Sequence, residues 1–392
     1  DPSGTTDTAQ YSIGLGTTAL DAITSGDRNV GIGYNALTAQ NSGRDSIAIG
    51  AYALETSTTG YYNVAIGSYT CQNLLGGYNN VAVGQGAMRA TDNAIGNTSV
   101  GHWALSAVTD QVGNVAVGYQ AGRDLVAANN TLIGYDAGTN VTSGEGNTVV
   151  GWKAIGAGIT TGANNTAIGS ESGKAITSGY ENTAVGRSAG EALTTGLRNV
   201  AIGGYALNSC STQHYNVAVG YNALQSTTAA NNTAVGAGAG TNVTTGDRQV
   251  AIGHNALSTC TNGWANTAVG WDAGSVIDDG DGNVCIGYEA ETSAAGSNNQ
   301  IVMGDSVTGN ADDSLCFGKD STDSAIAFGA TSITAPSDVR LKEDIQDEVV
   351  GLDFINELRP VTFRWKKAKD VPSDLKVHSD SEERVMNGKY NH

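Results

Sequence analysis

The sequence predicts an all-β protein, a parallel β-solenoid (β-roll) of 17-residue coils, and two observations support this. First, a glycine recurs from Gly16 to Gly304 in 17 steps, of which 14 are 17 residues long. Second, each glycine follows two branched residues that flank a small one, as in the NVAVG segment ending at Gly220. A fixed short period is typical of solenoids. Period-two alternation is typical of strands.

The positions around each glycine define one coil. The residue directly before the glycine is aliphatic in every repeat, as in Ile32 and Val219, and we expect it to be buried. We expect two short strands and two polar turns in each coil, around an interior lined by Val, Ile and Ala. With parallel coils about 4.8 Å apart, 17 steps make a rod of roughly 80 Å.

In the 17 repeats from Gly33 to Gly304, asparagine stands four residues before the glycine in 14, with Ser46, Gln249 and Gln300 as the exceptions. Stacked in register, such a column can form an amide ladder in which each side chain bonds to the next coil. A simpler interpretation is that asparagine suits the turn before a strand, and the two are compatible.

A thin interior of Val, Ile and Ala buries too little apolar area for one chain to be stable alone. We therefore expect several chains side by side as a homotrimer. Alanines after the glycine, such as Ala36, Ala121 and Ala223, would mark where backbones of different chains approach closely.

Composition and charge exclude several classes of function. The 392 residues include 54 glycines, 6% aromatic residues and a net charge of −18, and residues 1–336 carry 10 basic and 26 acidic side chains. Such an acidic rod repels nucleic acid and anionic membranes, so neither is an expected partner. The five cysteines lack metal-ligand spacing, and we interpret the acidic turn Asp278–Asn283 as solvated. We expect no metal and no cofactor.

The chain divides into four predicted segments. Residues 1–10 are a polar lead-in, 11–304 the repeat shaft, 305–336 a tapering cap or neck, and 337–392 a charged C-terminal segment. No proline lies between Pro2 and Pro336, as expected where every backbone N–H is needed. No signal peptide or membrane-spanning run is present, and the start at Asp1 without Met indicates a processed chain or a fragment.

The C-terminal segment combines helical spacing from Val349 to Leu358 with a strand-like VTFRW after Pro360. Its blocks SDVRLKEDI, GLDFINELRPV and FRW occur together and in order. They resemble the C-terminal intramolecular chaperone and autopeptidase family of phage tail spikes and fibres, the endosialidase type. That resemblance implies a short α+β chaperone domain, here truncated at His392.

The resemblance also implies chemistry at the domain boundary. Ser337 would attack the carbonyl of Pro336 and cleave the bond before itself, with Lys342 as the base. A lysine serves as a base near neutral pH only if burial lowers its pKa. The structural alternative is that Ser337 caps the following helix and Lys342 is a solvated surface charge.

The repeats resemble the head of trimeric autotransporter adhesins, whose shorter NSVAIG-type repeats form a left-handed parallel β-roll in each of three chains. This resemblance implies the same kind of solenoid here. A 17-residue coil departs from that repeat, so handedness and interface stay open.

Together these features predict a homotrimeric phage tail fibre or spike that takes part in host attachment, with self-cleavage as its only enzymatic activity. We expect it in the virion. The alternatives are a bacterial surface adhesin or extracellular filament, a polysaccharide-degrading tail spike, and an ice-binding solenoid. The expected partner is a host cell-surface receptor, which a row of exposed rings would bind as a glycan. The candidate rings are Tyr119, Tyr135, Trp152, Tyr221 and Trp271.

Overall fold

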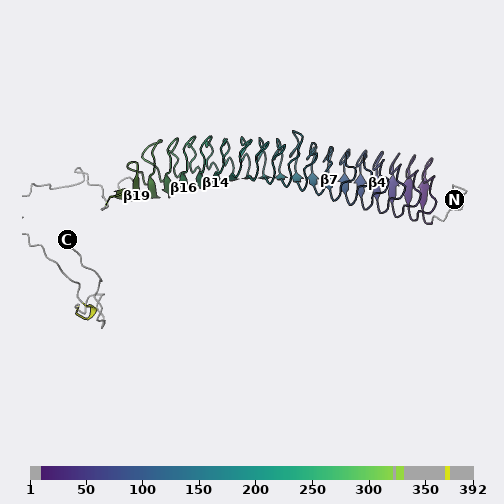
Figure 1. Cartoon of the computed structure of the whole chain (residues 1–392), viewed down its shortest axis with the longest axis horizontal. Helices are drawn as coiled ribbons and strands as arrows, with labels where there is room; N and C mark the ends of the chain where they lie inside the picture. Colours follow the sequence, from purple (N-terminus) through teal and green to yellow (C-terminus); the bar gives the residue numbers. More distant parts are fainter. Residues whose placement is uncertain (1–9, 321–323, 331–366, 371–392) are drawn as a thin grey trace, which may run out of the picture. The chain divides into compact units, whose positions relative to one another are not determined.

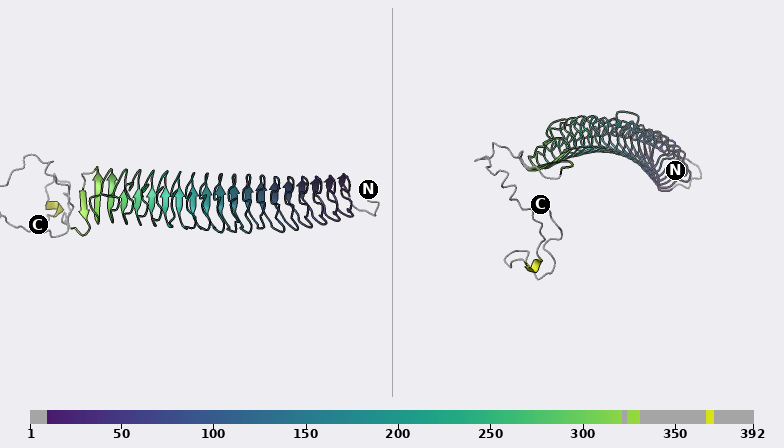
Figure 2. Two further views of the ribbon diagram at one scale, coloured as in Figure 1. Left: turned by 90° about the horizontal axis from the view of Figure 1, so that it is seen from above. Right: turned by 60° about the vertical axis from the view of Figure 1, so that its left-hand side comes forward.

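A computed structural model describes residues 10–320, 324–330 and 367–370. The chain divides into two units, Asp1–Pro336 and Ser337–His392. In the second unit the structure describes one short 3-10 helix, η2 (Ala368–Asp370). The first unit is a row of stacked coils that bows along its length (Figures 1 and 2). The predicted parallel β-solenoid of about 18 coils is confirmed.

One sheet of 20 strands runs the length of the first unit. Neighbouring strands pair in parallel, and their partners are equivalent residues of successive coils, as in Ala201 with Ala218. Only the last described strand turns back, because β20 pairs antiparallel with β19. The strands are β1 (Ile13–Leu15), β2 (Val30–Ile32), β3 (Ile47–Ile49), β4 (Val64–Ile66), β5 (Val81–Val83), β6 (Thr98–Val100), β7 (Val115–Val117), β8 (Thr131–Ile133), β9 (Thr148–Val150), β10 (Thr166–Ile168), β11 (Thr183–Val185), β12 (Val200–Ile202), β13 (Val217–Val219), β14 (Thr233–Val235), β15 (Val250–Ile252), β16 (Thr267–Val269), β17 (Val284–Ile286), β18 (Ile301–Asp305), β19 (Ser314–Lys319) and β20 (Ser324–Ala327).

Most coils contain one strand, so the expectation of two strands per coil is wrong. The rest of the coil is built from turns in which residues with a side chain adopt positive φ. In the coil of Gly33 these are Arg28 (φ 56°), Asn35 (55°) and Leu37 (51°). Backbone hydrogen bonds still join successive coils there, for example from the N–H of Leu37 to the carbonyl of Ala53 (3.0 Å). The turns therefore stack as regularly as the strands do.

The glycine that ends each strand is required by this stacking. Gly33 has a φ of +131°, and a Cβ there would lie 2.7 Å from the carbonyl oxygen of Gly50 in the next coil. Both the backbone conformation and the close approach exclude other residues. The period seen in the sequence is thus the spacing of one backbone contact, repeated in every coil.

The strand side chains point opposite to our expectation. The small central residue, such as Ala201 or Ala218, is fully buried, whereas Ile202, directly before the glycine, is 39% exposed. Because alternate residues of a strand face opposite sides, both branched residues lie on the outer face. The prediction that the aliphatic residue before the glycine is buried is therefore wrong.

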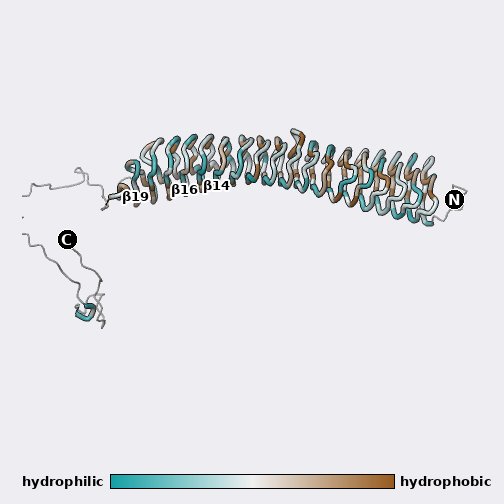
Figure 3. Tube along the Cα trace, viewed as in Figure 1, coloured by the Kyte–Doolittle hydropathy of each residue, from teal (hydrophilic) through white to brown (hydrophobic). Residues whose placement is uncertain are grey.

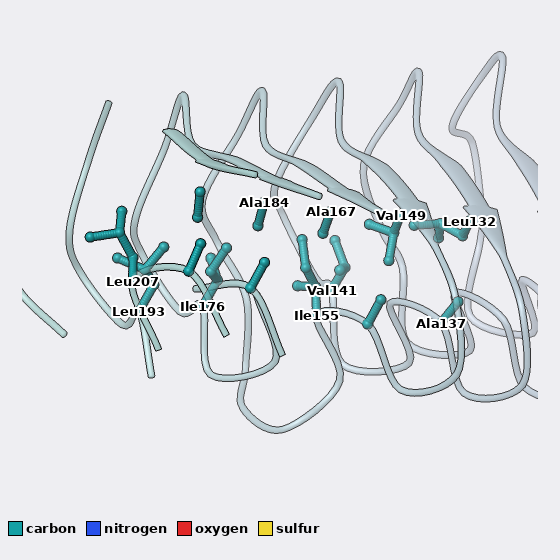
Figure 4. Close-up of a cluster of buried hydrophobic side chains, with 14 of the residues drawn as sticks. Leu132, Ala137, Val141, Val149, Ile155, Ala167, Ile176, Ala184, Leu193 and Leu207 are labelled. Atoms are coloured by element: carbon teal, nitrogen blue, oxygen red, sulfur yellow. The ribbon is translucent and has the colours of Figure 1, made fainter. Parts of the chain in front are cut away.

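The prediction that the alanines after the glycine lie between chains is also wrong. Ala36, Ala121 and Ala223 are fully buried within their own chain, so they cannot line a contact between chains. They form the interior together with the leucine that follows them and the strand alanine. Figure 4 shows this narrow row of small and aliphatic side chains, and Figure 3 shows apolar segments recurring from coil to coil.

Large and small residues compensate across the interior. Where the leucine position after the glycine holds Gly138, the strand centre holds Leu132 instead of alanine, and a Cβ on Gly138 would lie 2.7 Å from its Cδ2. The same leucine fills the space beside Gly122, where a Cβ would meet Cδ1 at 2.5 Å. Packing at constant volume keeps the coils the same size despite sequence changes.

The predicted asparagine ladder is confirmed. In this column the side chain of Asn182 donates to the carbonyl of Gly196 (2.8 Å), and its Oδ1 accepts the backbone N–H of Asn199 (3.0 Å). Asn182 and Asn199 are buried, so these bonds satisfy groups that water cannot reach. The ladder joins each coil to the next inside the rod.

Candidate functional site

The predicted cleavage site lies outside the residues that the structure describes. Pro336, Ser337 and Lys342 therefore have no geometry here, and their roles stay predictions. The two units of the chain meet at the bond between Pro336 and Ser337, which is the bond that the sequence predicts to be cleaved.

Exposed rings form short stacks along the row of coils. Tyr119 stacks on His102 (ring centroids 5.3 Å apart, interplanar angle 4°) and on Tyr135 (4.9 Å, 12°). Trp271 lies in the same way between His254 (5.7 Å, 15°) and Tyr288 (5.0 Å, 10°). These separations are close to the distance between neighbouring strands. The rings stack because each coil presents the same turn position to the next.

Stacking decides which part of each ring faces solvent. Both faces of Tyr119 and Trp271 lie against neighbouring rings, so these residues present their edges and polar atoms. Trp152 has the Lys153 ammonium over its face (4.7 Å), and Tyr221 meets Tyr205 edge to face (6.0 Å). A sugar that stacks on a ring needs an open face. Glycan stacking stays a prediction, and two of the rings at the ends of the stacks, Tyr135 and Tyr288, are 50% and 47% exposed.

A shallow groove lies beside the one coil that has 18 residues, and Figure 1 shows one loop projecting from the middle of the row. Arg123, Lys153 and Lys174 line this groove. Two of these cations have carboxylate partners: Arg123 bonds Asp124 (2.7 Å), and Lys174 bonds Glu171 (2.7 Å) with Glu191 at 3.5 Å. The groove is therefore close to neutral and has little attraction for an anion.

The carboxylates of the acidic turn accept hydrogen bonds from the preceding coil. Asp281 accepts the backbone N–H of Trp264 (2.7 Å), and the Asp278 carboxylate accepts the hydroxyl of Thr261. Among the residues with described positions, no group of His, Cys, Asp or Glu is arranged to hold a metal ion. In the same part of the chain, no helix is long and apolar enough to cross a membrane.

The five cysteines are buried free thiols: Cys71, Cys210, Cys260, Cys285 and Cys316. Burial raises the pKa of Cys71 and of Cys285 to about 12. A protonated, buried thiol is neither a nucleophile nor a metal ligand at neutral pH. These residues fill the interior in place of small apolar side chains.

The sequence reasoning missed the outer face of the sheet, which is the largest uniform surface of the rod. The spacing of two residues in the repeat could have predicted this outer face. The ladder asparagine and the strand alanine are two residues apart, so they share one face of the strand. If the asparagine column is buried, the branched residues on either side of the alanine must face outward.

The stacked coils make the described part of this chain a repetitive β-solenoid rod. Residues 337–380, directly after it, match the family model described as the chaperone of endosialidase. The combination fits a tail fibre or tail spike protein with an endosialidase-type chaperone domain. No curated protein and no solved structure matches the chain.

Proposed function

We propose that this chain is the shaft of a homotrimeric phage tail fibre or spike, assembled by its C-terminal chaperone segment and used in host attachment. The observation that carries the proposal is the position of the chaperone match at residues 337–380, immediately after the last coils of a long, regular solenoid. A chaperone at that place can act on the whole rod.

The regularity of the rod explains why a chaperone is needed. Most coils present similar residues at the same positions, and β10 to β16 share a central alanine and differ only in Val against Thr at the first position and Ile against Val at the third. Copies of the chain shifted by one coil therefore make nearly the same contacts as copies in register. A trimeric C-terminal domain that aligns three chain ends sets the register, and the coils then assemble from that end.

Cleavage after assembly makes this process irreversible. Once the segment from Ser337 onward has been released, unfolded chains no longer carry the domain that aligned them. The folded rod then persists because it unfolds slowly, and this kinetic stability suits a particle that must persist outside a cell. The acidic surface of the shaft, with a net charge of −16 over residues 1–336, keeps such rods apart in solution.

The alternatives differ in location and in receptor chemistry. A bacterial surface adhesin would use the same solenoid on a cell, and a polysaccharide-degrading spike would need paired carboxylates in a cleft. We favour attachment without degradation, because the groove beside the 18-residue coil is shallow and two of its cations, Arg123 and Lys174, are paired with carboxylates. The proposed receptor is a host cell-surface molecule, with a glycan as its proposed class because rings such as Tyr221 (58%) and Trp152 (46%) are exposed.

The test compares the full chain with a chain that ends at Pro336. We expect the full chain to give soluble trimers by light scattering. The shortened chain should give aggregates of mixed size, because nothing aligns the copies. Soluble, uniform trimers from the shortened chain would reject the chaperone role, and a monomeric full-length product would reject the trimer.

A further inference from the structure

The outer face of the sheet is a continuous stripe of uncharged, mostly apolar side chains, with threonine at seven of its 34 positions. From β2 to β18, the two outward positions of each strand that precede the glycine hold only Val, Ile, Thr and one Met. Their exposure is substantial in the single chain, with Ile202 at 39%, Ile252 at 39% and Ile286 at 41%. No charged residue interrupts the stripe, although the first 336 residues carry 36 charged side chains.

A bare face of this kind is unusual for a parallel sheet. Parallel sheets are normally covered on both faces, whereas antiparallel sheets more often have one face in water. Contiguous apolar patches of more than a few hundred Å² on soluble proteins mark interaction sites. The stripe holds two outward side chains on each of 17 strands, so about 24 Å² of exposed surface on each of the 34 matches the roughly 800 Å² per partner that a stable interface buries.

We infer that this outer sheet face is the contact surface between copies of this chain. The stripe runs the length of the rod with the same composition throughout, so a smaller partner would leave most of it exposed. A second copy has the same length and the same coil spacing, so it covers the stripe completely. Because the stripe is uncharged, the net negative charge of two copies does not oppose contact there.

The borders of the stripe agree with an interface of this kind. On one side of each strand lie residues of the preceding turn, including the ion pairs of Arg28 with Asp45 (2.6 Å) and of Arg198 with Glu181 (2.7 Å). On the other side, past the glycine, lie rings such as Tyr119 and Trp271. An apolar centre bordered by paired charges and aromatic rings is the usual composition of a protein interface.

The inference relies on the proposed trimer for the number of copies and for their parallel orientation. In parallel, in-register copies, the same residue of each chain lies next to its equivalents. A cysteine placed on the stripe should therefore pair with the same cysteine of another copy. The native cysteines do not interfere, because all five are buried.

The test uses Ile202→Cys, on the outer face of β12, in the full chain. The matched control is Ser209→Cys, at an exposed turn of the same coil and outside the sheet. After mild oxidation we expect covalent dimers on denaturing gels from Ile202→Cys, with less than a tenth as much from Ser209→Cys. Light scattering on the same samples, before oxidation, reports the number of copies.

The outcomes separate this inference from the proposed function. Trimers in which Ile202→Cys does not cross-link, or cross-links no better than Ser209→Cys, overturn the inferred face and leave the trimer in place. Monomers overturn both. A second substitution on the stripe, Ile252→Cys, should give the same result as Ile202→Cys, and a difference between the two would show that the stripe is not covered along its length.

Discussion

Asn63 Oδ1 accepts two hydrogen bonds from Asn80 of the next coil, one from its backbone N–H (3.0 Å) and one from its side-chain amide (3.1 Å). The same side chain of Asn80 also donates to the carbonyl of Ala94 (2.7 Å), and its own Oδ1 accepts the N–H of Asn97 (3.0 Å). One buried asparagine thus satisfies two backbone groups of the next coil and bonds the asparagine side chain of the preceding one. The ladder is an internal scaffold that does not depend on apolar packing.

The substitution Asn80→Ala should destabilise the rod by about 2–4 kcal/mol, because it leaves several buried donors and acceptors without partners. The matched control is Asn73→Ala, at an exposed position nearby, which should cost less than about 0.5 kcal/mol. Denaturant unfolding gives both values. Equal effects of the two substitutions would contradict a structural role for the ladder.

The substitution Gly84→Ala should also destabilise the rod strongly. The added Cβ would lie 2.5 Å from the carbonyl oxygen of Gly101, at a φ of +131°. Backbone strain and overpacking together should cost roughly 3 kcal/mol or more.

The control for Gly84→Ala is Gly96→Asn, in the next coil. Gly96 has a φ of +63° with open space around its Cα, and Asn79 adopts the same conformation (59°) at the equivalent position. The expected change in the thermal midpoint is therefore small for this variant and large for Gly84→Ala. A rod that tolerates both substitutions equally would show that coil spacing does not depend on the glycine column.

Glu291 should make the C-terminal coils more stable as the pH falls. Burial raises the pKa of its carboxyl group, and hydrogen bonds from Ser275 and Val276 offset part of that rise. Because the folded state binds the proton more tightly than the unfolded state, stability increases as the pH drops through the raised pKa. The increase is complete below the unfolded value near 4.3.

The measurement is hydrogen exchange at β17 and β18 between pH 7 and pH 4, corrected for intrinsic exchange rates. The variant Glu291→Gln cannot titrate, so its protection should lack this part of the pH dependence. Other carboxyl groups contribute equally to both proteins and cancel in the difference. Identical pH profiles for the two proteins would contradict a raised pKa at Glu291.

A complete gene product should split between Pro336 and Ser337 once its C-terminal domain has trimerised. Ser337→Ala removes the predicted nucleophile and little packing, so we expect an uncleaved but folded trimer. Lys342→Ala should give the same product by removing the base. Intact mass spectrometry distinguishes the products, and cleavage that persists in Ser337→Ala would reject the assigned serine.

The sequence by itself determined the solenoid, its period and the amide ladder. A parallel stack repeats every coil by translation, so any contact between neighbouring coils recurs at the same spacing in the sequence. Gly33 and Gly50 are an example, because the backbone of each motif glycine lies in close contact with the backbone of the glycine in the next coil. The chaperone segment was predicted from a motif that begins at Ser337, and the family match covers the same residues.

Only the tertiary structure decided which face of each strand is inside. Alternation in NVAVG separates two faces but does not say which one the chain closes around, and hydrophobicity alone favours burying Val219 over Ala218. The turns decide the matter, because positive φ at residues such as Leu37 closes each coil tightly on its alanine side. The buried leucines of the turns, such as Leu37, fill much of the interior, which leaves space for a small residue at most strand centres and places the branched residues outside, where the sequence pattern had not predicted them.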